Sequence, residues 1–195
     1  MITSTFADRL FAVLGALAVP GTPHHVTSAD YHGFGQNSAT LPLAPVDDLP
    51  MWLLAAAADP ERDLRVCPVA TDGRVGALWV IWHPAFTLSP SGSKQPSSEA
   101  VASLRDALRT QPRPSALIDA GSEWIAVWRL DAPITATDAA PLLAQLARHL
   151  GGYPPVGPLS AVSIPVAGLV RNWSTVDPRR VDLLETSPGA HAPQN

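Results

Sequence analysis

The segment PSALIDAGSEWIAVWRLDAPI, residues 114–134, constrains the fold more than any other part of the chain. It holds a short apolar run, 116–118, and a longer run, 124–130, that is rich in β-branched and aromatic residues. The polar break 119–123 separates the two runs. Two such runs around a short polar break are typical of a β-hairpin. We therefore expect two paired strands within residues 115–130.

Helical and extended patterns are interleaved along the rest of the chain, without a strict alternation of strand and helix. Apolar residues at helical spacing predict helices within residues 6–19, 46–63, 97–111 and 135–152. The expected N-caps are Asp47 or Asp48, Ser97 or Ser98, and Thr135 or Thr137. Extended patterns predict strands within 22–50, 63–70, 74–86 and 153–186. The Ser/Pro/Gly-rich stretch 87–98 carries no signal of regular structure.

These patterns predict the α+β class, with a mixed sheet and helices packed against one face of it. We expect a single domain over residues 1–187 and a disordered tail over residues 188–195.

The composition restricts the classes of function. Hydrophobic residues make up 46% and charged residues 15% of the chain, which fits a compact globule with a sparsely charged surface. The formal net charge is -4, whereas proteins that hold duplex nucleic acid by its phosphates are usually basic. No apolar run reaches the ~18 residues of a membrane span. The single cysteine, Cys67, allows no internal disulfide, and it predicts a cytoplasmic setting and a small buried side chain.

Simple structural roles account for two groups of conspicuous residues. His24, His25 and His32 match no spacing of a metal site, and we expect them to be ordinary histidines of a surface loop. Three tryptophans lie in strand patterns: Trp79, Trp124 and Trp128. Packing in the core explains this second group.

Three segments together carry a resemblance to a known family. They are residues 114–134, LLAQLARHLGG at 142–152 and SIPVAGLVRNWSTVDPRRVDLLE at 163–185. In this order they resemble the catalytic domain of archaeo-eukaryotic primases, in particular the RepB-like and primase-polymerase-like proteins of plasmids and phages. The resemblance covers roughly residues 60–186. It implies a primase-polymerase architecture with an RRM-like core and a role in DNA replication.

The positions that the resemblance marks as functional hold unsuitable residues. Where the family has Asp-x-Asp on the apolar strand, this chain has Ile81 and His83. Two carboxylates in this spacing hold a divalent metal ion, whereas isoleucine cannot, and a lone imidazole is a poor ligand for Mg²⁺. Ile125 replaces the family's histidine, Glu123 a glycine, and Ser163 an arginine. The resemblance therefore implies a degenerate active site without catalytic residues, metal or cofactor, and it predicts that Ile81 and Ile125 share one patch.

Two alternatives remain open. An active DNA primase or polymerase, a nucleotidyltransferase, would need relocated ligands for Mg²⁺ or Mn²⁺, drawn from His83, Asp119, Glu123 and Asp182. A protein-binding module unrelated to DNA would have kept only the fold.

The first interpretation makes the chain an accessory subunit in the replication of a plasmid, phage or integrated element. Its partner would be a replication protein, a helicase or a catalytic primase subunit. One group of residues is suited to weak binding of single-stranded nucleic acid, by charge and by stacking on an aromatic ring. It comprises Arg171, Asn172, Trp173, Arg179 and Arg180.

Overall fold

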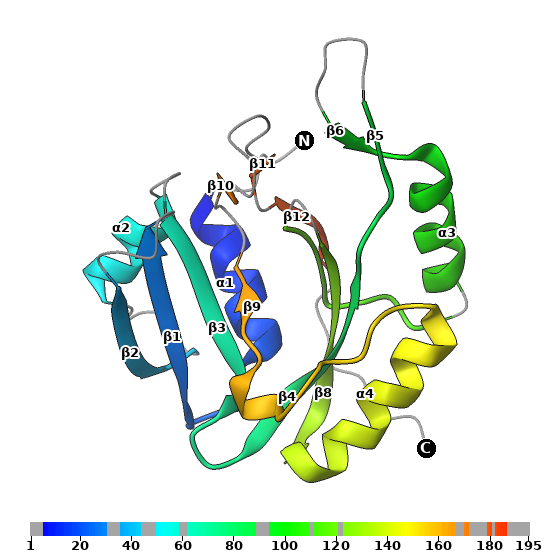
Figure 1. Cartoon of the computed structure of the whole chain (residues 1–195). Helices are drawn as coiled ribbons and strands as arrows, with labels where there is room; N and C mark the ends of the chain where they lie inside the picture. Colours follow the sequence, from blue (N-terminus) through cyan, green and yellow to red (C-terminus); the bar gives the residue numbers. More distant parts are fainter. Residues whose placement is uncertain are drawn as a thin grey trace.

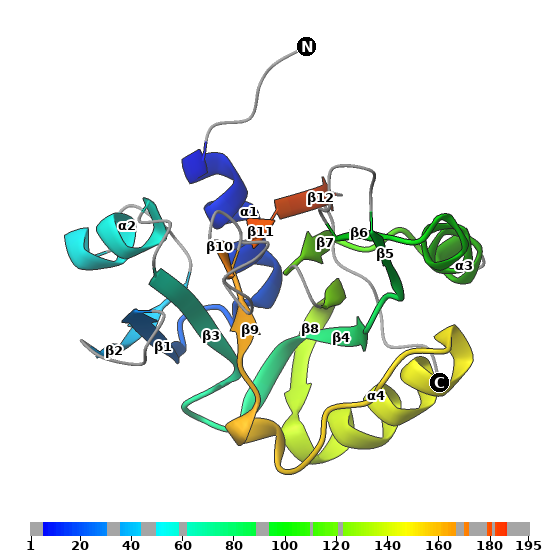
Figure 2. The same ribbon diagram turned by 45° about the horizontal axis from the view of Figure 1, so that its top comes forward.

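Figures 1 and 2 show a computed structural model of the chain. The structure describes residues 6–30, 36–43, 50–58, 62–88, 94–109, 111–120, 123–166, 170–171, 179–180 and 182–186. The predicted cap at Asp47 or Asp48, His32, and the predicted tail 188–195 lie outside the described residues.

Helices and strands are interleaved much as the sequence patterns predict. The α-helices of the described residues are α1 (Phe6–Leu17), α2 (Met51–Ala58), α3 (Ser98–Arg109) and α4 (Ala136–Leu150). The strands are β1 (Pro23–Asp30), β2 (Asn37–Pro42), β3 (Arg62–Ala70), β4 (Arg74–Trp82), β5 (Phe86–Leu88), β6 (Lys94–Pro96), β7 (Ala116–Asp119), β8 (Trp124–Thr135), β9 (Ile164–Pro165), β10 (Val170–Arg171), β11 (Arg179–Arg180) and β12 (Asp182–Thr186). A 3₁₀ turn, η2 (Leu159–Ala161), follows α4.

Most strands belong to one sheet of two halves, which Figure 1 shows on either side of α1. The strand order is β12-β7-β8-β4-β3-β1-β2, and β9 pairs with β3. The halves meet at β3 and β4, where Val69 pairs with Val75. Every pairing between the described strands is antiparallel, so the sheet is antiparallel where we expected a mixed one. Direct hairpins such as β3–β4 and β7–β8 produce this pattern, and the predicted α+β class is confirmed.

Helices cover both faces of the half-sheet that contains β4 and β8, so the prediction of helices on one face is wrong. Figure 2 shows α1 on one side of these strands and α4 on the other. Ile125 and Val127 belong to the same core cluster as residues of α1. Their neighbours Trp124 and Trp128 belong to a second cluster, with Leu104 of α3 and residues of α4. Side chains of a strand alternate between its faces, and both faces of β8 are apolar, so each one requires a cover.

Local signals fix the ends of α3 and α4. The hydroxyl of Ser97 accepts a hydrogen bond from the backbone N–H of Ala100 at 3.1 Å. The hydroxyl of Thr135 accepts one from the N–H of Asp138 at 3.1 Å. Each bond satisfies a backbone donor that the helix itself leaves unpaired, as predicted for these caps. Gly151, at φ 65°, ends α4 in the left-handed conformation.

Gly76 allows α1 to approach β4 closely. It lies at the irregularity in the β4–β8 register between Val75 and Ala77. A Cβ atom at this position would overlap the backbone oxygen of Ala18, just beyond α1. The glycine is therefore required by close backbone packing rather than by its own dihedral angles.

The stretch 87–98, in which we expected no regular structure, contributes to a small hairpin instead. Strands β5 and β6 pair antiparallel, with Phe86 opposite Pro96 and Leu88 opposite Lys94. Its short, polar strands show no clear alternation, so the sequence pattern gives little sign of them. None of the helices in the described part of the chain has the length and hydropathy needed to cross a bilayer.

Candidate functional site

The two isoleucines at the positions of interest lie directly opposite each other. In the register of β4 and β8, Ile81 pairs with Ile125. On the other side of β8, Ile125 pairs with Ile118, and Ile118 pairs with Leu183 of β12. Residues that pair across antiparallel strands present the same face of the sheet. The prediction that Ile81 and Ile125 share one patch is confirmed, and the register extends it into an apolar row that includes Ile118.

This apolar row is closed to solvent at its centre. Ile125 is 1% exposed and Ile118 is 0% exposed, and both belong to the core cluster that includes α1. Trp79, two residues before Ile81 on the same face, is also fully buried. Ile81 itself is only partly buried. Ile125, where the resemblance implies a histidine, is therefore part of the hydrophobic core.

His83 lies at the exposed end of the same face. Its ring is in contact with Tyr153, with 5.0 Å between ring centroids and a 53° interplanar angle. The N–H of Tyr153 donates to the carbonyl oxygen of Ile81 at 2.7 Å, which holds this tyrosine beside the strand. Both side chains are exposed. The surroundings of His83 are thus an aromatic ring and an apolar row.

Two of the three fallback carboxylates, Asp119 and Asp182, lie in a different row of the sheet from His83. Asp119 pairs with Trp124, and Trp124 pairs with Trp82, so Asp119 belongs to the row next to the isoleucines and faces the opposite side of the sheet. The register places Asp182 opposite Asp119. Glu123 ends the β7–β8 turn, where its carbonyl oxygen accepts from the N–H of Ala120 at 2.8 Å. Within the described residues, no group of three His, Cys, Asp or Glu side chains is arranged to hold a metal ion.

Solved structures of other proteins have a similar architecture. A crystal structure of the primase RepB' superposes with a TM-score of 0.66 at 16% identity, over 97% of this chain and 59% of that one. The archaeo-eukaryotic primase domain of the cyanophage S-2L primase-polymerase gives a TM-score of 0.64 at 15% identity, over 96% and 94% of the two chains. The chain has an archaeo-eukaryotic primase-like fold.

The catalytic domain of RepB', solved in complex with initiator DNA, superposes with a TM-score of 0.63 at 15% identity, over 95% of this chain and 89% of that one. No family model matches the sequence, and comparison with curated proteins finds no match either. At these identities the likeness concerns the primase-like fold alone. The chain spans 59% of the length of the longer RepB' structure.

An arginine that the sequence patterns did not single out lies beside Ser163, the residue that replaces the family's arginine. Arg65 of β3 donates from Nε to the Ser163 hydroxyl at 2.8 Å and from Nη2 to the Ser163 carbonyl oxygen at 2.9 Å. Its Nη1 donates to Asp63 at 3.3 Å. Because the two residues are 98 positions apart, no local pattern points to this contact. The guanidinium is held by bonds within the chain and joins β3 to the segment before β9.

The predicted nucleic-acid-binding group is only partly described. Strands β10 and β11 pair Arg171 with Arg179, so the backbone brings these two positions together. Arg180 pairs with Val170. Asn172 and Trp173 lie outside the described residues.

His24 is buried in β1, so its prediction as a histidine of a surface loop is wrong. It is 0% exposed. Its Nε2 accepts from the N–H of Val19 at 3.1 Å, and its Nδ1 lies 3.0 Å from the carbonyl oxygen of Cys67. Burial lowers the pKa of His24 below its ordinary value. The side chain thus connects the end of α1 to β3 as a neutral imidazole, while His25, its neighbour on the strand, is exposed.

Cys67 is buried, as predicted, and its burial raises the pKa of its thiol. A raised pKa leaves less of the reactive thiolate, so the chemistry of this cysteine is that of a small apolar side chain.

Proposed function

We propose that this chain is a catalytically silent primase-like protein that acts in the cytoplasm as an accessory subunit in the replication of a plasmid, phage or integrated element. The burial of Ile125 carries the proposal. A group that contacts an incoming nucleotide must be accessible, and this position is 1% exposed within an apolar row. The site has therefore lost both its polar groups and its opening.

The distribution of carboxylates supports the same proposal. Metal-dependent nucleotidyl transfer uses oxygen ligands that converge on one or two divalent ions. Asp119 faces away from the side of the sheet that carries Ile81 and Ile125, and the ring of His83 is in contact with Tyr153. A set of relocated ligands that combined His83 with Asp119 would have to draw on both faces of the sheet at once.

The charge of the chain favours a partner over independent DNA binding. The net charge of -4 opposes approach to a polyanion. The RepB' neighbour is described in complex with initiator DNA, which makes single-stranded DNA a reasonable ligand to test here. We infer that a replication protein, a helicase or a catalytic primase subunit supplies most of the affinity, and that Arg171, Arg179 and Arg180 add a weak contact.

A synthesis assay tests catalytic silence. The purified chain is incubated with single-stranded template and nucleotides, in separate reactions with Mg²⁺ and Mn²⁺, and the products are resolved by length. We expect no dinucleotide or longer product in either reaction. Template-dependent synthesis that disappears in Asp182→Ala or Glu123→Ala would establish the active alternative.

A binding titration tests the nucleic-acid contact. A labelled single-stranded oligonucleotide is titrated at low and at physiological salt with the wild type, with Arg179→Ala/Arg180→Ala, and with Arg148→Ala on α4 as a control. We expect weak, salt-dependent binding that the double variant loses and the control keeps. Binding that is tight and insensitive to salt, or unchanged in the double variant, would favour a module that kept the fold without its role in replication.

A further inference from the structure

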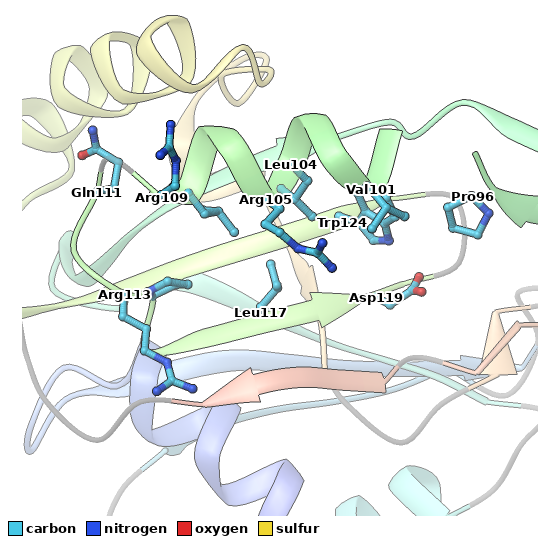
Figure 3. Close-up of a pocket in the computed structure, with 12 residues that line it drawn as sticks. Pro96, Val101, Leu104, Arg105, Arg109, Gln111, Arg113, Leu117, Asp119 and Trp124 are labelled. Atoms are coloured by element: carbon cyan, nitrogen blue, oxygen red, sulfur yellow. The ribbon is translucent and has the colours of Figure 1, made fainter. Parts of the chain in front are cut away.

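A pocket of about 610 Å³ lies between α3 and the strands β7 and β8 (Figure 3). It is on the opposite face of β8 from Ile125, so it is separate from the apolar row. Apolar side chains form much of its lining: Val101, Leu104, Leu108, Leu117 and Trp124. Its volume lies in the range of ~300–1,000 Å³ that small-molecule sites occupy.

The pocket contains a hydrogen-bond donor with no partner. The Nε1–H of Trp124 has no acceptor among the residues that the structure describes, although the residue is 4% exposed. The two tryptophans nearby differ from it. Trp82 donates to the carbonyl oxygen of Leu150 at 3.2 Å, and Trp128 donates to that of Pro112 at 2.8 Å. Buried indole N–H groups are normally satisfied, so an unpaired one that lines a pocket indicates an acceptor on a ligand.

Two arginines of α3 add positive charge to the pocket. Val101, Arg105 and Arg109 are spaced four residues apart and so lie along one stripe of the helix. Arg105 and Arg109 line the pocket and are exposed, and no hydrogen bond or ion pair within the described part of the chain engages them. Figure 3 shows Asp119 toward the opposite end of the pocket from Arg109. A bound anion is therefore drawn toward the arginines and away from the carboxylate.

We propose that this pocket binds a small organic anion with a flat apolar body and a hydrogen-bond acceptor. The flat body packs against Trp124, Leu104 and Leu117, the acceptor pairs with Trp124 Nε1–H, and the anionic group pairs with Arg105 and Arg109. An aromatic carboxylate and a nucleoside monophosphate share this chemistry. The proposal uses a different face of the sheet from the proposed function and does not depend on it.

Fluorescence of anilinonaphthalene sulfonate, which combines a flat apolar body with an anionic group, tests the site. We expect saturable binding by the wild type. Arg105→Ala/Arg109→Ala should weaken it about tenfold or more, and Trp124→Phe, which keeps the ring but removes the N–H, about fivefold. Arg148→Ala on α4 should bind as the wild type does. Val101→Trp, which fills the pocket from its partly exposed rim, should abolish the signal.

Competition experiments show whether the pocket prefers a carboxylate or a phosphate ligand. Displacement of the probe by indole acetate but not by AMP indicates a carboxylate ligand, and the reverse indicates a phosphate ligand. Adenosine, which lacks the anionic group, should compete at least about tenfold less well than AMP in the second case. Equal probe affinity in the wild type and in the double arginine variant would overturn the proposal, as would equal binding by Val101→Trp, because both place the probe elsewhere. Circular dichroism of each variant confirms that a loss of binding is not a loss of fold.

Discussion

The two faces of strand β8 are both apolar, but different groups lie against them. On one face, Ile125 and Val127 pack with α1 into an apolar core. On the other face, Trp124 lines a pocket that also contains Asp119 and arginines of α3. The face on which the family resemblance places catalysis is closed by α1. The polar groups that a ligand can use lie on the other side of β8, on β7 and α3.

This contrast follows from the way in which the sheet is covered. A sheet covered on both faces needs apolar side chains on both, and isoleucine at positions 81 and 125 extends the core that α1 forms with β8. Each fully buried isoleucine contributes on the order of 1.5–3 kcal/mol. The apolar row thus stabilises the fold at positions where a buried polar group without a partner would cost stability.

The largest expected effect comes from putting charge back on the apolar face. Ile125→Asp buries a carboxylate among the apolar residues of this core cluster, and we expect a loss of about 4 kcal/mol or more in the free energy of unfolding. Ile81→Asp should lose less, because Ile81 is only partly buried. Urea denaturation followed by circular dichroism measures both. If Ile125→Asp unfolds like the wild type, or if Mg²⁺ restores its stability, the face is a preserved site rather than a core.

A second test concerns the contact between α1 and β4 that closes this face. Gly76→Ala places a methyl group into the backbone oxygen of Ala18, and we expect a loss of about 2–4 kcal/mol. Gly15→Ala is the matched change, since a Cβ atom there meets nothing within 4 Å. It lies inside α1, so it should stabilise the protein by about 0.5–1 kcal/mol. Thermal denaturation of the two variants should therefore shift in opposite directions.

The sequence predicted elements whose signals are local. The hairpin 115–130 and the helices capped by Ser97 and Thr135 were found because alternation, turn residues and caps lie within a few neighbouring positions. That Ile81 and Ile125 share one patch was also predicted, but from the family resemblance rather than from the residues alone; their direct pairing was not.

Features made by distant residues escaped prediction. His24 is buried by contacts with Val19 and Cys67, the second of them 43 positions away. The pocket escaped because Arg105 and Arg109 look like the ordinary solvated face of an amphipathic helix. Tertiary packing places β7 and β8 beside these arginines, and no local sequence pattern shows it. The face that Asp119 presents depends on the register of the hairpin, and a shift of one residue reverses it.

The buried His24, which contacts the end of α1, makes the free energy of unfolding of the protein depend on pH. Its folded pKa lies below the ordinary value of 6.5, chiefly because burial removes water from the ring. Below about pH 6.5 the unfolded chain therefore binds more protons than the folded chain. The stability that neutral His24 contributes is complete above about pH 6.5 and declines as the pH falls toward the folded pKa. The free energy of unfolding, measured between pH 8 and about pH 5, should fall on the acid side. His24→Gln should flatten that slope, while His25→Gln, at an exposed position, should keep it.

The smallest expected effect compares two tryptophans on the pocket side of β8. Trp→Phe removes the same atoms at Trp124 and at Trp128, but only Trp128 loses a hydrogen bond that the structure describes, the one to Pro112 at 2.8 Å. We expect Trp128→Phe to be less stable than Trp124→Phe by about 1 kcal/mol, the net value of one such bond. At Trp124 the change removes an unpaired buried donor, which offsets part of the lost packing. Urea unfolding of both variants without ligand measures the difference. Equal losses would mean that Trp124 Nε1–H already has a partner in the free protein. It would then not be available as a donor to a ligand in the pocket.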